Sequence, residues 1–245
     1  MAGPYICQYN EFDTGINLYV KKGRTMNKMK FLKKVVVYGL LLLIIFVSLY
    51  SLFLRDIWVN KGITKSERRQ TLPGDGLVKN PDTVYEQAIT IEAPADIVWS
   101  YLIQVGYQRA GWYNWDFINR WAADNYFYEN NRSANRIIPE LQDLEQGDKI
   151  SILPDISFDV EELKEKEYFL LTGVEDGEHI ITWVYKLKNL QEDQTRLIVR
   201  WQSDIADGFF FDLMNYVITE PGGAGIQQWE MLKGIKKRAE RDYNN

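Results

Sequence analysis

The chain has 245 residues, enough for one large domain with additional segments. Hydrophobic residues make up 46% of it and charged residues 26%, a composition that permits a globular core and argues against disorder. Its single cysteine, Cys7, excludes an intrachain disulfide, and its single histidine, His179, excludes a zinc site built from histidines and cysteines. We therefore expect no metal and no cofactor.

Charge is distributed unevenly along the sequence. Residues 21–34 contain seven basic residues and no acidic one, whereas residues 56–245 contain 32 acidic and 21 basic residues. An acidic main domain repels phosphate backbones, which argues against nucleic acid as a partner. The basic run instead precedes an apolar run, and this order favours a role at a membrane.

Residues 35–54 form that apolar run of 20 residues without a charge. A helix rises about 1.5 Å per residue, so this length spans the roughly 30 Å hydrocarbon core of a bilayer. Trp58 could then lie at the interface. A buried core helix and a cleavable signal peptide are the alternatives. The run is long for a signal peptide and lacks a small-residue cleavage site at its end, so we favour an uncleaved, single-pass anchor.

The basic residues that flank this segment indicate its orientation. Seven precede it, and five follow within residues 55–69, mixed with acidic residues. The bias predicts a cytoplasmic tail at residues 1–34, with the main domain on the outer side of the cell membrane. Met26 or Met29 would be a natural start for such an anchor, so residues 1–25 are either a short tail or an artefact of start-codon assignment.

Residues 55–82 are polar and interrupted by glycines and prolines, as is typical of a linker. The main domain is expected at residues 83–243. Apolar residues alternate through residues 85–93 and predict a half-buried strand. Pro94 suits the start of a helix, Gly106 its end, and residues 112–128 are expected to hold one or two short helices after an aromatic turn.

Several short strands follow, with tight turns between them. We expect them around residues 150–152 and at residues 158–164, 168–174, 180–187 and 195–202. Alternation in the last two places Trp183 and Trp201 inward and Arg200 outward. Such short connections imply an antiparallel meander.

The C-terminal part is predicted to be helical. Residues 209–218 could form a short helix that Pro221 and two glycines interrupt. A last amphipathic helix then carries one apolar face, formed by Ile226, Trp229, Leu232, Ile235 and Ala239. The layout is α+β, with one long helix available to pack on a curved sheet.

Four stretches of this sequence resemble a known superfamily. They read AITIEAPADIVWSYLIQVGYQRAGWYNWD, NRIIPELQDLEQGDKI, TRLIVRWQSD and EMLKGIKKRAE. Together they look like a bacterial branch of the SRPBCC superfamily, the START-like, helix-grip or polyketide cyclase/dehydrase-like proteins, over about residues 72–240. The resemblance implies a curved antiparallel sheet that grips the C-terminal helix around a deep apolar cavity. Members bind lipids, sterols, polyketides or aromatic molecules, and some catalyse cyclisation or dehydration. The apolar segment departs from the plain soluble form.

The resemblance also suggests which residues surround such a cavity. Trp183 and Trp201 from the strands and Met231 from the helix are expected to line it, although each could equally be ordinary core. Tyr113, Trp115 and Asp116 are expected at its mouth, where the alternative is that they cap and pack the loop.

Ionisable residues are the candidates for catalysis. Arg136 and Glu140 could form a charged pair inside the cavity or a passive salt bridge on the surface. Histidine is a common general acid or base, but His179 follows a turn and could simply face solvent. Asp116, Glu140 and His179 are the catalytic candidates, and Tyr113 is a fourth ionisable group to consider.

Three functions remain open on the sequence. The first is a membrane-anchored domain that binds a hydrophobic small molecule or lipid. The second is a cyclase or dehydratase on an apolar or aromatic substrate, which requires an ionisable group facing the cavity. The third is an interaction domain without a ligand, which a cavity well below the roughly 300 Å³ of ligand sites would favour.

Overall fold

The computed structural model describes residues 12–50, 53, 55–205 and 225–245. The chain divides into two compact units, Met1–Tyr50 and Ser51–Asn245, which we describe separately. The short helix expected at residues 209–218 and its interruption at Pro221 lie outside the described residues.

The first unit is dominated by one helix, α1 (Phe12–Leu49). Its part Lys28–Leu49, 22 residues long, is long and apolar enough to cross a membrane. The predicted span, residues 35–54, overlaps this part but extends beyond the end of α1. The basic residues expected in a separate tail continue the same helix, so no break divides tail from span between Phe12 and Leu49.

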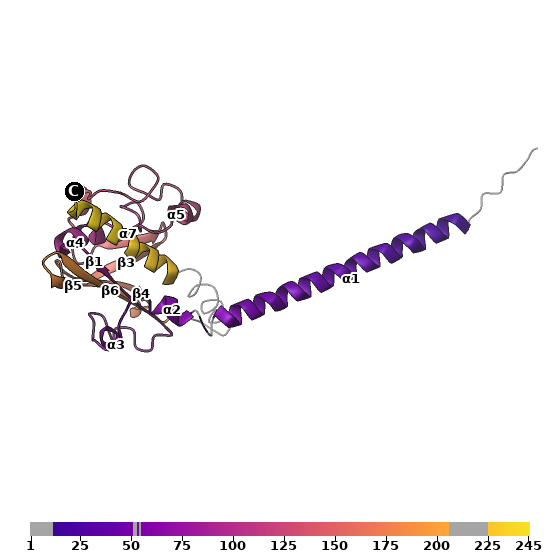
Figure 1. Cartoon of the computed structure of the whole chain (residues 1–245), viewed down its shortest axis with the longest axis horizontal. Helices are drawn as coiled ribbons and strands as arrows, with labels where there is room; N and C mark the ends of the chain where they lie inside the picture. The colour runs from indigo at the N-terminus through magenta and orange to yellow at the C-terminus, as the bar shows by residue number, and fades with distance from the viewer. Residues whose placement is uncertain (1–11, 51–52, 54, 206–224) are drawn as a thin grey trace, which may run out of the picture. The chain divides into compact units, whose positions relative to one another are not determined.

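The second unit is built on one six-stranded sheet, in which every neighbouring pair is antiparallel. The spatial order is β1-β6-β5-β4-β3-β2, so the first strand closes against the last while the other five form the predicted meander (Figure 1). The strands are β1 (Thr83–Ile91), β2 (Lys149–Leu153), β3 (Ile156–Lys164), β4 (Tyr168–Glu175), β5 (Glu178–Gln191) and β6 (Gln194–Ser203).

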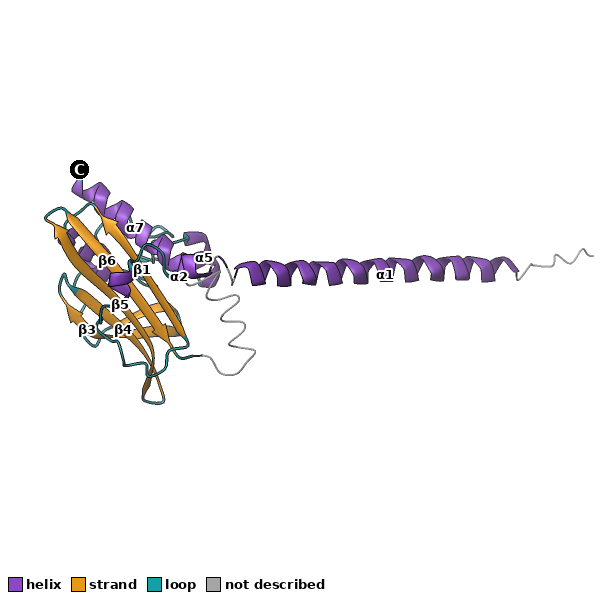
Figure 2. Ribbon diagram, turned by 60° about the horizontal axis from the view of Figure 1, so that its bottom comes forward, coloured by secondary structure: helices purple, strands orange, loops and turns teal. Residues whose placement is uncertain are grey.

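Two helices cover the inner face of this sheet. They are α4 (Ala95–Ile103), which begins directly after Pro94, and the C-terminal α7 (Gly225–Tyr243); Figure 2 shows α7 lying along the strands. Both contact the strands and each other, and their side chains join those of the sheet in one apolar core. The predicted α+β class and helix-grip arrangement are therefore confirmed.

The buried face of α7 differs from the predicted one in its first turns. Gln228 and Met231 are buried there, whereas Ile226 and Trp229 are half-buried. Trp229 instead contacts the segment before the sheet: a side-chain carbon on Gly62 would lie 3.2 Å from its ring. The packed face of α7 is therefore wider than its apolar residues alone predict, and its buried side begins with a glutamine, Gln228.

The segment expected as a linker packs against the folded unit: its first helix contacts α7 and β1, and the residues after that helix cover the outer face of the sheet. It contains α2 (Arg55–Val59) and α3 (Lys65–Arg68), and a capping box between Thr64 and Glu67 fixes the start of α3. Leu72 is 2% exposed and forms a second apolar cluster with Ala88, Leu170, Val184 and Ile198 on that outer face. Although it contains several glycines and prolines, this segment is part of the folded unit.

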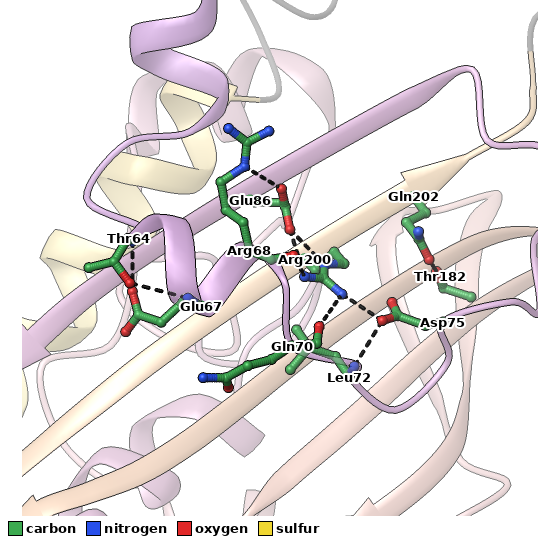
Figure 3. A network of polar contacts seen from close by, with 10 residues as sticks. All are labelled: Thr64, Glu67, Arg68, Gln70, Leu72, Asp75, Glu86, Thr182, Arg200 and Gln202. Atoms are coloured by element: carbon green, nitrogen blue, oxygen red, sulfur yellow. Dashed lines mark hydrogen bonds and ion pairs between the residues drawn. The ribbon is translucent and has the colours of Figure 1, made fainter.

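Arg200 is the centre of the polar contacts that hold this segment (Figure 3). It faces outward on β6, as predicted, but is only 6% exposed because residues 68–75 cover it. Its guanidinium pairs with Glu86 at 2.7 Å and Asp75 at 2.6 Å, and it donates to the backbone carbonyls of Arg68 and Gln70. Four acceptors thus surround one buried cation.

A second arginine on β6 holds α3. Both carboxylate oxygens of Glu67 accept hydrogen bonds from Arg196, at 2.8 and 2.9 Å, a bidentate geometry that is stronger than a single contact. Arg196 also donates to the carbonyl of Gly62 at 2.6 Å. These bonds lower the pKa of Glu67 to about 2.

Candidate functional site

A cavity of about 300 Å³ lies between the first turns of α7, the inner face of the sheet and the loop that follows α4. It falls at the end of the sheet where α7 begins. Its described lining consists of Tyr85, Trp112, Asn114, Asn119, Tyr126, Ile152, Trp183, Trp201, Gln227, Gln228 and Met231.

Aromatic rings form one continuous wall of this cavity. The indoles of Trp112 and Trp183 stack with ring centroids 5.1 Å apart, and Trp201 meets Trp183 edge-on at 5.1 Å. Tyr85 on β1 is the register partner of Trp201 on β6, so the antiparallel pairing brings both to the same place. Flat apolar surfaces of this kind suit the faces of an aromatic or alicyclic molecule.

A buried amide pair lies next to this aromatic wall. Gln228 on α7 accepts a hydrogen bond from the indole N–H of Trp183 at 2.9 Å and donates to the side chain of Gln87 at 3.2 Å. Gln87 on β1 in turn donates to the carbonyls of Trp58 and Gly225. The chain of bonds fixes the first turn of α7 against β1 and sets the orientation of Trp183.

A second set of amides borders the cavity. Asn119 donates to the side-chain oxygen of Asn114 at 2.8 Å, and Asn114 donates to that of Gln227 at 3.1 Å. This chain links α5 (Asp116–Ala122) to α7 across the cavity border. The amide groups can donate to or accept from a ligand without carrying a charge.

The remaining polar groups of the described lining are also neutral. The hydroxyl of Tyr126 donates to the carbonyl of Ile152 at 2.7 Å, and burial raises the pKa of this phenol. The indole N–H of Trp112 lies close enough to the Tyr126 phenol to lower its pKa, against the effect of burial. This N–H is buried and makes no hydrogen bond of normal geometry among the described residues. Among the described lining residues there is no carboxylate, imidazole, thiol, lysine or arginine.

Three of the seven residues expected around the ligand lie at this cavity. Trp183, Trp201 and Met231 are all in its described lining. The hydroxyl of Tyr185 on β5 donates a hydrogen bond to the sulfur of Met231 at 3.7 Å, and this contact helps to hold the methionine at the cavity wall. The other four predicted residues are absent from the described lining.

Tyr113 is buried beside the cavity. Its hydroxyl accepts a hydrogen bond from Gln104 at 2.6 Å, and Arg238 lies over its ring at 4.4 Å. Burial raises the pKa of this phenol. Gly234 allows α7 to approach: a side-chain carbon there would lie 2.2 Å from the carbonyl oxygen of Tyr113. Tyr113 therefore positions the loop against α7.

Trp115 and Asp116 start α5. Asp116 accepts a hydrogen bond from the hydroxyl of Ser133 at 2.6 Å, and Ser133 accepts one from the backbone N–H of Tyr113. Trp115 stacks with Phe117 at 6.3 Å. Both predicted mouth residues thus take the alternative reading, in which they cap and pack the loop.

The other ionisable candidates lie apart from the cavity and from one another. Arg136 pairs with Glu129 at 3.0 Å on the surface, not with Glu140, which is exposed in the short 3-10 turn η2 (Pro139–Leu141). His179 is half-buried on β5 beside the β4–β5 turn, paired in register with Val174. The structure therefore does not gather the catalytic candidates into one site.

The sequence contained signals for several lining residues that were not predicted. Within residues 112–115 the lining alternates, so Trp112 and Asn114 reach the cavity while Tyr113 and Trp115 do not. Gln228 occupies an apolar-face position three residues before Met231, and a glutamine on such a face signals a buried polar contact. Asn119 on α5, Tyr126 in the loop after it and Ile152 on β2 reach the cavity through the packing of distant segments, which no local pattern indicates.

Comparison with solved structures returned proteins of similar fold at low sequence identity. The Zhui aromatase/cyclase from a Streptomyces species is 16% identical over 65% of this chain and 94% of its own, with a TM-score of 0.36. The self-sacrificing resistance protein CalC from Micromonospora echinospora is 10% identical over 66% and 97%, with a TM-score of 0.39. Norcoclaurine synthase from Thalictrum flavum is 12% identical over 65% and 95%, with a TM-score of 0.34.

These likenesses concern the fold alone, and no function is taken from them. No protein-family model and no curated protein matches the sequence.

Proposed function

We propose that this protein is a membrane-anchored binding domain that holds one small, neutral, largely apolar molecule in the cavity described above. The observation that carries the proposal is the lining itself, which combines three indoles with a set of side-chain amides. Apolar walls with a few placed polar groups are the usual composition of small-molecule sites. The amides would orient a carbonyl or hydroxyl group of the ligand.

The size of the cavity narrows the class of ligand. Pockets for small molecules range from about 300 to 1,000 Å³, so a volume of about 300 Å³ falls at the lower end. A molecule of two or three fused rings suits this volume better than a two-chain lipid. The volume is not well below the ligand-binding range, which favours binding over an interaction domain with a filled core.

The chemistry of the lining favours binding over catalysis. A cyclase or dehydratase needs a proton donor or acceptor within hydrogen-bond reach of its substrate. Asp116, Glu140 and His179 are absent from the described lining, and the hydroxyl of Tyr126 already donates its proton to the carbonyl of Ile152. The described polar groups can recognise a ligand, but they do not form an acid–base pair.

Ligand retention by the full-length protein tests this proposal. The chain is purified in mild detergent, and bound molecules are extracted and identified by mass spectrometry. Ile152→Phe places a phenyl ring within the cavity, whereas Val174→Phe places the same ring at an exposed position of β4. We expect a molecule that co-purifies with the wild type and Val174→Phe and is lost from Ile152→Phe. Equal retention by all three proteins would refute binding in this cavity.

We also propose that α1 anchors the domain with its N-terminus in the cytoplasm. The span Lys28–Leu49 and the excess of basic residues before it support this orientation. Cys7 is the only cysteine, so labelling of intact cells with a membrane-impermeant maleimide tests it directly. We expect Cys7 to be protected and a cysteine at position 193 (Asp193→Cys in Cys7→Ser) to react; the reverse pattern would invert the topology.

A further inference from the structure

Helix α5 has an unusual distribution of side chains. Its most buried residue is an asparagine, Asn119, at 4% exposure, whereas Phe117 is 63% exposed and Trp121 is 89% exposed. Phe117 and Trp121 are four residues apart and therefore share one face of the helix. Trp115 stacks on Phe117 and extends this face. We call Trp115, Phe117 and Trp121 the α5 aromatic face.

Polar bonds on the inner side of α5 hold it in place. Asn119 bonds to Asn114, which bonds to Gln227 of α7, and Asp116 bonds to Ser133. Arg120 donates to the carbonyl of Asn131 at 3.2 Å. These bonds fix the helix without the exposed side chains of Phe117 and Trp121. An apolar face that the fold does not use for its own packing marks a contact surface.

The α5 aromatic face and the cavity share one helix. Asn119 and the preceding Asn114 line the cavity, while Phe117 and Trp121 face away from the domain. The hydrogen bond between Asn114 and Gln227 places the start of α5 beside the first turn of α7, at the end of the sheet that holds the cavity. Ile57 of α2, 55% exposed, adds an apolar side chain at this end.

We propose that the α5 aromatic face docks on a lipid bilayer and that the cavity exchanges its ligand with that bilayer. Tryptophan and phenylalanine partition into the interfacial zone of membranes. The chain itself supplies the proximity, because only five residues separate the end of α1 at Leu49 from the start of α2 at Arg55. The exchange of ligand with the bilayer rests on the proposed function, whereas the docking of the α5 aromatic face does not.

Charge favours a neutral lipid surface over a charged partner. Asp116 and Arg120 are the charged residues of α5, and they balance. Residues 56–245 have 32 acidic and 21 basic residues, so anionic lipids would repel the domain as a whole. Docking is therefore driven by burial of the aromatic face, and zwitterionic lipid suffices for it.

Site-specific fluorescence in nanodiscs tests the docking. Full-length Cys7→Ser protein carries an environment-sensitive fluorophore at Ala122→Cys, an exposed position next to Trp121, in phosphatidylcholine discs with or without nitroxide-labelled lipid. A matched label at Asp193→Cys reports the β5–β6 hairpin, at the opposite end of the sheet. We expect blue-shifted emission and quenching at position 122 and water-like, unquenched emission at position 193.

Removal of the aromatic face is the decisive comparison. Phe117→Ser with Trp121→Ser should abolish the shift and quenching at position 122, and it should leave thermal unfolding unchanged because both side chains are already exposed. Quenching that survives these substitutions would overturn the proposal. A blue shift at position 122 without quenching by the nitroxide lipid, seen only when a disc holds two chains, would also overturn it. That result would indicate a contact between copies. Loss of docking with normal ligand retention would leave the proposed function intact.

Discussion

At the scale of single residues, the orientation of the cavity wall depends on neutral hydrogen bonds. Trp183 is the central indole, and its N–H is satisfied by Gln228 rather than by solvent. Gln228 also satisfies Gln87, which is fully buried. Because a buried polar group without a partner costs about 1–3 kcal/mol, these three residues stabilise the fold only as a set.

Gln228→Leu tests this dependence. The substitution keeps the approximate volume but leaves the indole N–H of Trp183 and the side-chain oxygen of Gln87 without partners. We expect the free energy of unfolding to fall by about 2–4 kcal/mol, measured by denaturant titration of the full-length protein. Gln227→Leu is the matched control: its residue is half-buried and makes one weaker amide contact, so its cost should stay below about 1 kcal/mol.

At the scale of elements, periodicity in the sequence predicted the strands and helices that local patterns determine. Alternation located the strands and the inward side of Trp183 and Trp201, and helical spacing located α4 and α7. The packing of residues 55–82 escaped prediction because it depends on contacts between residues more than 100 positions apart, such as Arg200 with Asp75. Most of the cavity lining escaped for the same reason, since Asn119 on α5 and Tyr126 in the loop after it reach the cavity only through the packing of distant segments.

Arg200→Met tests whether the segment before the sheet belongs to the fold. Loss of the guanidinium leaves Asp75 without a cationic partner and Glu86 with only the exposed Arg68, and breaking a buried ion pair costs about 3–5 kcal/mol. We expect that loss in stability, together with faster hydrogen exchange at residues 62–78. Arg136→Met is the control, because its exposed pair with Glu129 contributes at most about 1 kcal/mol. Unchanged exchange in Arg200→Met would mean that apolar contacts alone hold the segment.

Glu67 should make the attachment of α3 dependent on pH. Its pKa is about 2 in the folded protein against an ordinary value of 4.5, so its contribution is complete above pH 4.5 and is lost as the pH falls toward 2. Glu67→Gln retains the capping geometry without the charge. With solvent screening, we expect the wild type to exceed this variant by about 1–2 kcal/mol at neutral pH. Denaturant titrations across this range should show the difference vanishing; a constant difference would contradict the assignment.

At the scale of the whole molecule, the chain combines a candidate membrane span with a domain that encloses a neutral cavity. The two features support one reading, in which a tethered domain takes a small apolar molecule from a bilayer through the region around α5. We propose that the ligand carries no charge, because the indoles and amides of the described lining carry none, and this is the central claim.

Binding of a matched pair of naphthalene compounds tests that claim most directly. Acetylnaphthalene and naphthoate share a ring system and nearly the same size, but only the second carries a charge. The methyl resonance of Met231, at the cavity wall, is followed by nuclear magnetic resonance in the full-length protein with isotope-labelled methionine. The account predicts that the neutral ketone shifts this resonance saturably and that the carboxylate does not. A shift by the carboxylate alone, or by neither compound, would contradict it.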